Sequence, residues 1–316
     1  MRYILAVDGG GTKTKVIAAD ELGTVVGEGE SGPTNLTATS TGAAALSLRE
    51  AIRQAIENLG QNPHFSVMTM GLAGMDTPKE YETARAMFSQ VLQWYSLDTF
   101  ILVNDIHIAL ESGTQAENAV ALISGTGSNC FGRNSDGETA QVGGMDYLLT
   151  DQGSGFELGR RVLREAVKSY DGRTDKSLLE QLVAEHFHIA SLAELKDVVY
   201  NPPLSKAHIA SLAKICVQAN DQGDTVAHQI CLDAATQLRI MIHTVVRRLG
   251  MEQHSVECVL AGSIAQLPVI QDELRLQLQP LVPHLLFSIP HRPPVYGAVS
   301  LALKQLAQPT VATTPQ

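Results

Sequence analysis

The chain has 316 residues, of which 44% are hydrophobic and 18% are charged, so it is long enough to form about two domains with their own cores. Its formal net charge of -10 argues against nucleic acid and anionic membranes as main partners, because both repel an acidic surface. The four cysteines include no CxxC pair, which is typical of reduced thiols and not of a zinc or iron–sulfur site.

The N-terminal residues predict a soluble, cytoplasmic protein. They hold no long apolar segment followed by a small-residue cleavage site, so no signal peptide is expected. No apolar run in the sequence approaches the roughly 20 residues that a helix needs to cross a bilayer.

The first motif is a glycine turn between two apolar runs. Residues 3–7 and 16–19 are apolar, which predicts a hairpin of two buried strands around the segment 8–14. We expect the glycines of this turn to adopt positive φ and to leave room for a ligand, because they carry no Cβ. Its N–H groups and the hydroxyls of Thr12 and Thr14 suit an anionic oxygen; the alternative is a tight hairpin without a ligand.

The rest of the first half alternates strands and helices. Asn35 follows the turn-forming residues 31–34 and is predicted either to bind a sugar hydroxyl or simply to form the turn. Hydrophobic spacing predicts, in chain order, a strand at 24–28, a helix at 48–59 that ends before Gly60, a strand at 67–72, a helix at 78–94 and a strand at 100–103.

Asp105 is the candidate for chemistry in this half. It follows a predicted buried strand, and ligands of open α/β sheets lie beyond the carboxyl ends of the strands. A carboxylate there can accept the proton of a substrate hydroxyl during phosphoryl transfer. The alternative is that Asp105 caps a helix at 106–111, which aspartate does well, and the spacing allows both roles.

The second half repeats the opening pattern. Residues 119–123 and 130–133 read as strands around the glycine–hydroxyl turn 124–129, and a third strand follows. Two such turns in matching contexts indicate two similar α/β domains that face each other across a cleft, with nucleotide phosphates between the two hairpins.

The remaining elements surround a second glycine-rich stretch. Asp151 in the stretch 143–155 is predicted either to accept hydrogen bonds from a sugar or to form a turn or cap before the next helix, whose basic residues are expected to form a solvated face. The later elements are mainly helical at 175–250, a strand at 257–260 before the turn 261–263, a helix at 295–306 and a disordered tail from Gln308.

Together these motifs resemble the N-acetylglucosamine kinase group of the BadF/BadG/BcrA/BcrD ATPase family, in the actin–hexokinase superfamily. The resemblance covers about residues 3–306 and rests on the segments 8–14, 104–105, 124–129, 143–144, 151–154 and 260–263. It implies an α/β fold of duplicated ribonuclease-H-like domains, at 1–115 and 116–316, the second with a helical insertion at about 156–250. The last helix is placed in the second domain, with packing against the first as the alternative.

The resemblance also implies a role for each matching residue. The protein would transfer the γ-phosphate of ATP to the 6-hydroxyl of N-acetylglucosamine, with Asp105 as general base and with Mg²⁺ held by Asp8 through water. ATP would be bound by Gly10, Gly11, Thr12, Lys13, Gly125, Thr126, Gly127, Ser128, Gly262 and Ser263. The sugar would be bound by Asn35, Asp105, Thr126, Gly144, Met145, Asp146 and Asp151. A homodimer is expected.

The sequence departs from the family where the substrate is selected. Many relatives have Gly-Gly-Trp-Gly-His where this chain has Met145 and Asp146 after the glycine pair. If Asp146 faces the sugar, its charge suits the ammonium of free glucosamine better than a neutral acetamide. Glucosamine therefore stays open as the acceptor, as do N-acetylmuramic acid and glucose.

Two other functions are weighed against a sugar kinase. An activator ATPase that drives electron transfer into a dehydratase would hold an iron–sulfur cluster, for which the cysteine spacing offers no pair. A nucleotide-switched structural or chaperone module would hydrolyse ATP without a sugar. The repressor-and-sugar-kinase family is disfavoured because its cysteine-rich zinc motif is missing from this sequence.

Overall fold

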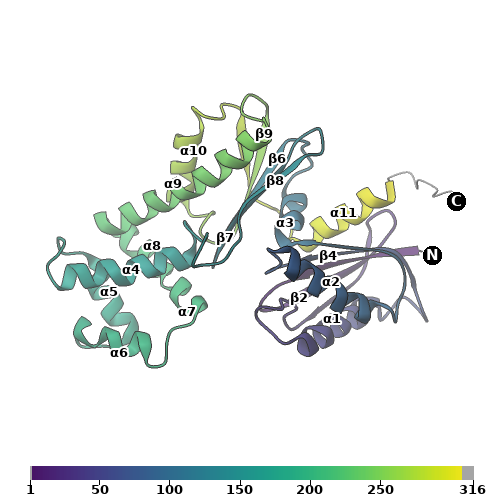
Figure 1. The fold of residues 1–316 in the computed structure, drawn as a ribbon, viewed down its shortest axis with the longest axis horizontal. Helices are drawn as coiled ribbons and strands as arrows, with labels where there is room; N and C mark the ends of the chain where they lie inside the picture. The colour runs from purple at the N-terminus through teal and green to yellow at the C-terminus, as the bar shows by residue number, and fades with distance from the viewer. Residues whose placement is uncertain (1, 308–316) are drawn as a thin grey trace. The chain divides into compact units, whose positions relative to one another are not determined.

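The computed structural model describes residues 2–307, which form two units (Figure 1). Unit 1 holds residues 2–115 and 290–307, and unit 2 holds Ala116–Ile289. The second domain was expected to run to residue 316, whereas the helix after residue 290 packs within unit 1, the alternative kept open for it. The tail for which disorder was predicted lies outside the described residues.

Unit 1 is built on a five-stranded sheet in the order β3-β2-β1-β4-β5. β1, β2 and β3 form an antiparallel meander, while β4 and β5 run parallel to β1. The parallel strands bring their carboxyl ends to one edge, where Asp8 pairs with Gly71 and Leu72 pairs with Asn104. The strands are β1 Arg2–Gly9, β2 Thr14–Asp20, β3 Val25–Ser31, β4 His64–Leu72 and β5 Ser96–Asn104.

Helices cover both faces of this sheet because β1 is apolar on both sides. Leu5 and Val7 belong to a core cluster with the first two helices, while Ile4 and Ala6 belong to a second cluster with α3 and α11. A strand buried on both faces reads as a continuous apolar run, as this one does. The helices are α1 Thr41–Ile56, α2 Pro78–Leu92, α3 Asp105–Gly113 and α11 Val295–Ala307.

The first helix begins earlier than its hydrophobic spacing predicted. Ser40 caps α1 by accepting a hydrogen bond from the Ala43 N–H, so the helix starts at Thr41 and not near residue 48. Its first turns are rich in glycine and alanine, which carry little periodic signal. Gly60 has φ +79 but follows the end of the helix at Ile56 by several residues.

Unit 2 has a sheet of the same topology, in the order β10-β9-β6-β7-β8. β6, β7 and β8 form the antiparallel meander, and β9 and β10 run parallel to β6. The equivalence of the two sheets confirms the duplication predicted from the two glycine hairpins. The strands are β6 Ala119–Ser124, β7 Ser128–Arg133, β8 Thr139–Gly143, β9 Val256–Ala261 and β10 Leu285–Ser288.

The helices of unit 2 lie mostly between β8 and β9 in the sequence. They are α4 Gly155–Tyr170, α5 Leu178–Phe187, the short 3-10 helix η1 Leu192–Glu194, α6 Leu195–Tyr200, α7 Lys206–Ser211, α8 Ala213–Asp221, α9 Thr225–Arg248 and, after β9, α10 Pro268–Leu278. Within the stretch predicted to be mainly helical, the chain breaks at Leu212 between α7 and α8, which the hydrophobic spacing did not show. Neither α10 nor β10, a short strand with no buried residue, was predicted from the sequence.

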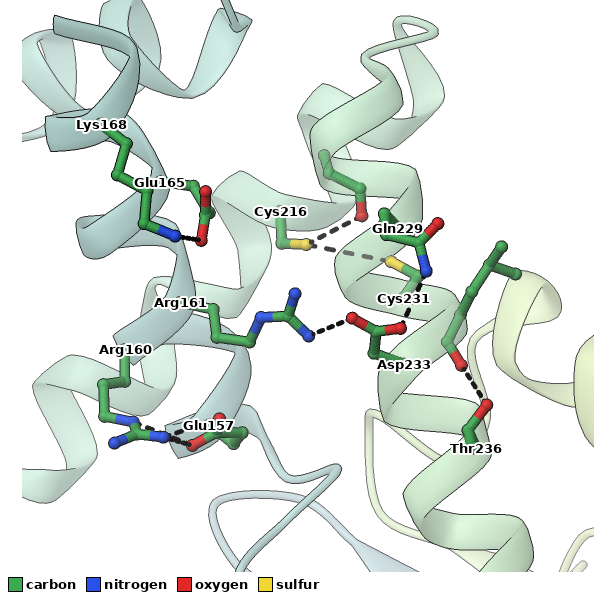
Figure 2. A network of polar contacts seen from close by, with 12 residues as sticks. Glu157, Arg160, Arg161, Glu165, Lys168, Cys216, Gln229, Cys231, Asp233 and Thr236 are labelled. Atoms are coloured by element: carbon green, nitrogen blue, oxygen red, sulfur yellow. Dashed lines mark hydrogen bonds and ion pairs between the residues drawn. The ribbon is translucent and has the colours of Figure 1, made fainter. Parts of the chain in front are cut away.

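Two cysteines that are separated in the sequence meet in the core of unit 2. The sulfurs of Cys216 on α8 and Cys231 on α9 are 3.9 Å apart, as free thiols (Figure 2).

Among residues 2–307, the structure has no helix whose length and hydropathy would let it cross a bilayer.

Gly297→Ala is expected to destabilise the protein by about 1–3 kcal/mol, because a Cβ at Gly297 would lie 1.9 Å from the carbonyl oxygen of Ile108 on α3. The matched control is Gly42→Ala in α1, where a Cβ would meet nothing within 4 Å. Thermal unfolding of both variants measures the difference. Equal melting temperatures would show that α11 does not pack on α3 through this glycine.

Candidate functional site

The glycine turn of unit 1 joins β1 to β2. The Gly10 N–H donates to the carbonyl of Lys13 at 3.0 Å, which closes the turn. None of its three glycines has positive φ, so the expected backbone conformation is wrong. Gly9 is needed for a different reason: a Cβ there would lie 2.4 Å from the hydroxyl of Thr34. The turn therefore needs glycine for the close approach of a neighbouring loop.

The polar side chains of this turn, Thr12, Lys13 and Thr14, differ in burial and in their hydrogen-bond partners. The buried Thr14 hydroxyl bonds the Gly32 carbonyl at 2.8 Å and the Thr34 hydroxyl at 2.9 Å, so it holds the loop and does not face a ligand, contrary to expectation. Thr12 is exposed. The Lys13 ammonium forms an ion pair with Glu30 at 3.0 Å.

Asn35 lies beside the glycine turn. Its N–H donates to the Gly10 carbonyl at 3.2 Å, and its Oδ1 accepts from the N–H and the hydroxyl of Thr37, both at 2.8 Å. Gly74 allows this approach, because a Cβ there would lie 2.6 Å from Asn35 Oδ1. Asn35 thus forms the turn, while its Nδ2 has no hydrogen-bond partner among the described residues and can serve a ligand oxygen.

Asp8 and Asp105 lie at the carboxyl ends of β1 and β5, and both are partly buried. The cap of α3 is Asn104, whose Oδ1 accepts from the Ile106 N–H at 3.1 Å. The alternative that Asp105 serves as this cap is therefore wrong. Its carboxylate is the first side chain of α3, at the strand-end position where ligands of α/β sheets bind.

Burial changes the acidity of both carboxyls. Burial, with smaller contributions from the neighbouring Asp8 and Asp76 carboxylates, raises the pKa of Asp105 to about 7. Burial also raises the pKa of Asp8 to about 6, although Lys13 opposes the shift. Asp105 can therefore exchange a proton near neutral pH, and a cation placed near these carboxylates would relieve their mutual repulsion.

The chemistry of this acidic group fits a hydrated divalent cation. Mg²⁺ usually keeps several waters and binds one or two protein carboxylates together with phosphate oxygens. Among residues 2–307, no group of three or more His, Cys, Asp or Glu side chains is arranged to hold a metal directly. A site at Asp8 that acts through water is compatible with both observations.

The glycine turn of unit 2 is held by two neighbouring segments. The buried Ser124 hydroxyl donates to the Gly153 carbonyl at 2.8 Å, and the Gly155 N–H donates to the Gly125 carbonyl at 2.7 Å. Gly262 has φ +86, and a Cβ there would lie 2.3 Å from the Ser124 carbonyl oxygen. The structure thus brings together the turn after β6, the start of α4 and the turn after β9.

A cavity of about 390 Å³ opens at these turns. Three of the predicted ATP-binding residues line it: Gly125, Thr126 and Ser263. Its opposite wall comes from α7 and α8, which contribute Ala207, Ala210, Ser211, Ala213, Lys214 and Val217. Small side chains leave room for a flat ring, and the exposed Lys214 ammonium has no ion-pair partner among the described residues. The sequence analysis missed this wall, although the spacing of its alanines was visible.

The segment after β8 carries the residues predicted to bind the sugar. The Gly144 N–H donates to the Ser128 carbonyl at 3.3 Å, and the Met145 N–H donates to the Thr150 hydroxyl at 2.6 Å. The Met145 side chain is 54% exposed. Asp146 has φ +69, a left-handed conformation that aspartate tolerates better than most residues.

Asp151 and Asp146 share one cation, Lys206 of α7. Asp151 is 5% exposed; its Oδ1 accepts from the Ser128 N–H at 2.9 Å, and its Oδ2 lies 2.8 Å from the Lys206 ammonium. Asp146 is ion-paired to the same ammonium. Asp151 does not cap α4, a role that Ser154 takes. No spacing in the sequence connects Lys206 to these carboxylates, so the sequence analysis missed it.

Three of the four basic residues of α4 form ion pairs. Figure 2 shows Arg160 beside Glu157, Arg161 beside Asp233 and Lys168 beside Glu165, with ion-pair distances of 2.7, 2.7 and 2.8 Å. A second cavity, of about 720 Å³, lies between this helix and the segment 192–209 and contains none of the predicted site residues. The larger cavity is therefore not part of the site predicted from the sequence.

Several known proteins resemble this chain in sequence. A family model described as the BadF/BadG/BcrA/BcrD ATPase family matches residues 5–302. An N-acetylmuramic acid/N-acetylglucosamine kinase from Clostridium acetobutylicum is 30% identical over 304 residues, which cover 96% of this chain and 98% of that protein. The glucosamine kinase GspK from Vibrio cholerae is 31% identical over 189 residues, which cover 60% of this chain and 62% of that protein.

The fold is shared with solved structures. A proposed N-acetylglucosamine kinase from Chromobacterium violaceum matches with a TM-score of 0.75 at 22% identity, over 96% of this chain and 99% of the other. This likeness confirms a two-domain α/β fold of the actin-like ATPase type. The family match extends over nearly the whole described chain, and the chain belongs to the BadF/BadG/BcrA/BcrD ATPase family.

Proposed function

We propose that the protein transfers the γ-phosphate of ATP to the 6-hydroxyl of N-acetylglucosamine. The observation that carries the proposal is Asp105, a partly buried carboxylate at the end of β5 whose pKa is raised to about 7. A general base works best when its pKa lies near the operating pH. The Clostridium relative is named a kinase of this sugar, which supports the same acceptor.

Asp105 would take the proton of the sugar hydroxyl as the oxygen attacks phosphorus. Phosphoryl transfer needs little covalent help from a protein, so the main contributions are positioning and charge stabilisation. Asn35 Nδ2, beside the glycine turn of unit 1, would orient a sugar hydroxyl. The N–H groups of the two glycine turns, with Thr12, would bind phosphate oxygens.

Asp8 would hold Mg²⁺ through water. When bound, the ion neutralises part of the phosphate charge. The protein's own part is to keep the Asp8 and Asp105 carboxylates near each other and partly out of water, so that one retains the ion while the other exchanges a proton.

The nucleoside would bind in the 390 Å³ cavity of unit 2. Gly262 lets the backbone approach the turn at Gly125, and Ser263 lines the cavity. The Lys214 ammonium lies on the cavity wall with no acidic partner among the described residues, which suits a phosphate of the nucleotide.

Glucosamine is the alternative acceptor. The Vibrio relative carries that name, and Asp146 adds a carboxylate near the residues predicted to bind the sugar. N-acetylglucosamine is favoured because the Asp146 charge is already paired with Lys206.

The proposal includes a cytoplasmic homodimer, for which light scattering after size-exclusion chromatography is the test.

The proposed function predicts sugar-dependent ADP release with ATP and Mg²⁺. In a panel of N-acetylglucosamine, glucosamine, N-acetylmuramic acid and glucose, N-acetylglucosamine should give the highest kcat/KM. Asp105→Asn should lower turnover by orders of magnitude while ATP still binds, because the base is lost and the nucleotide contacts remain. ADP release that does not depend on any sugar, or near-normal turnover in the variant, would contradict the proposal.

Asp105→Asn should also stabilise the protein at pH 7.5, and less so at pH 5. The folded pKa of about 7 exceeds the ordinary value of 3.8, so the stability contributed by this group is complete below pH 3.8 and is lost as the pH rises through about 7. Asparagine does not ionise and avoids a loss on the order of 1–4 kcal/mol.

Thermal unfolding in EDTA at the two pH values measures this effect. The control is Asp136→Asn, which makes the same chemical change at an exposed turn of unit 2. An Asp105→Asn variant that melts no higher than the unchanged protein at pH 7.5 would show that the carboxylate is not destabilised by its surroundings.

Lys214→Ala should raise KM for ATP severalfold and leave KM for the sugar unchanged, because the ammonium lines only the cavity proposed for the nucleoside. Lys196→Ala is the matched control, since Lys196 is an exposed lysine of α6 that lies outside this cavity. A rise in KM for the sugar instead, or the same effect in both variants, would remove Lys214 from the nucleotide site.

A further inference from the structure

Lys206 is the cation of a small acidic cluster in unit 2. Its ammonium is ion-paired to Asp146 and lies 2.8 Å from Asp151 Oδ2. It also lies 5.6 Å from the centre of the Tyr147 ring, and that ring packs on Phe156 with centroids 4.8 Å apart. Two carboxylates, one ammonium and an aromatic face form the kind of surroundings in which proteins bind amine ligands.

The two carboxylates depend on this cation to different degrees. Asp151 is 5% exposed and needs a partner for the charge that burial leaves without water. Asp146 has a side chain that is 64% exposed and can be solvated without Lys206. Burial lowers the pKa of Lys206, but the interactions with Asp146 and Asp151 raise it by more. The net shift is upward, so the ammonium stays charged.

We propose that Lys206 makes the enzyme select against free amino sugars, because its ammonium fills the position between Asp146 and Asp151 that the ammonium of glucosamine would otherwise take. This inference rests on the proposed function, which places both carboxylates at the sugar. A protonated amino sugar would have to displace Lys206 or lie beside it as a second cation, and like charges at such distances repel.

A neutral acetamide meets no such conflict. The Lys206 ammonium has three N–H donors, of which one bonds Asp146, while Asp151 Oδ2 is an ion-pair partner without a well-aligned hydrogen bond. A donor therefore remains for a neutral acceptor such as the carbonyl of an N-acetyl group. Lys206 thereby reverses the preference that Asp146 alone would give, and it makes N-acetylated or otherwise uncharged sugars the substrate class of this site.

The test compares kcat/KM for glucosamine with that for N-acetylglucosamine, below the pKa of the glucosamine amine. Lys206→Met keeps the apolar stem and removes the charge, so the ratio should shift toward glucosamine by about tenfold or more. Lys206→Arg keeps the charge and should keep the original ratio. Lys196→Met, in α6, is the control for removing a lysine of this unit and should leave the ratio unchanged.

A double variant tests whether the carboxylates cause the shift. Adding Asp146→Asn to Lys206→Met should reduce the gain for glucosamine, since one carboxylate is then left for the ligand ammonium. A ratio that stays unchanged in Lys206→Met, or an equal fall in kcat/KM for both sugars, would overturn the proposal and leave Lys206 a structural role only.

A binding measurement tests the proposal in a second way, and its part on the unchanged protein does not depend on the folding of Lys206→Met. Glucosamine should raise the melting temperature of Lys206→Met more than N-acetylglucosamine does, and the order should be reversed in the unchanged protein. The same order in both proteins would overturn the proposal. This measurement needs no turnover, so it separates failure of the inference from failure of the kinase assignment, which would appear as an unchanged protein that phosphorylates no sugar.

Discussion

The cost of taking a carboxylate out of water is the constraint on which the candidate residues of each unit depend. In unit 1, burial raises the pKa of Asp8 to about 6 and that of Asp105 to about 7. The nearby Lys13 is bonded to Glu30 and offsets the shift at Asp8 only in part. The carboxylates at the strand ends are therefore held at a cost in stability, and a bound cation or a proton relieves it.

In unit 2, the charge of a buried carboxylate is compensated by other groups of the chain. Asp151 is more deeply buried than the carboxylates of unit 1, yet it has a backbone N–H on one oxygen and the Lys206 ammonium near the other. A carboxylate compensated within the chain holds a loop in place, whereas one that lacks full compensation is available for chemistry. This contrast supports the proposal in which Asp105 is the reactive carboxylate and Asp151 has a structural and selective role.

The packed sheets and helices beneath the buried carboxylates supply stability that offsets the cost of burying them. β1 buries side chains on both faces, so the strand that ends at Asp8 is held by two cores at once. Close contacts between elements rely on glycine: Gly297 lets α11 approach α3, and Gly262 lets the turn after β9 approach the turn after β6. Side chains at the strand ends are therefore held in well-defined positions, because the sheet beneath them is rigid.

The sequence by itself determined the elements whose signal is local. Apolar runs and glycine turns predicted both hairpins, their duplication and the position of Asp105 after a buried strand, because strands buried on both faces leave a continuous hydrophobic record. Motifs with fixed order and spacing identified the family that the comparisons confirm. Local signal failed where elements were short or exposed, as at β10 and at the break between α7 and α8.

Only the tertiary structure decided which polar groups are left for a ligand. Thr14 and Asp146 looked available in the sequence, yet the Thr14 hydroxyl bonds within its own loop and Asp146 is ion-paired to Lys206. Asn104, not Asp105, caps α3. Hydrogen bonds and ion pairs between distant segments depend on how helices and loops pack on the sheet. The spacing of residues along the sequence does not show how far apart two such segments lie in the folded chain. The availability of each charge is therefore a property of the folded chain.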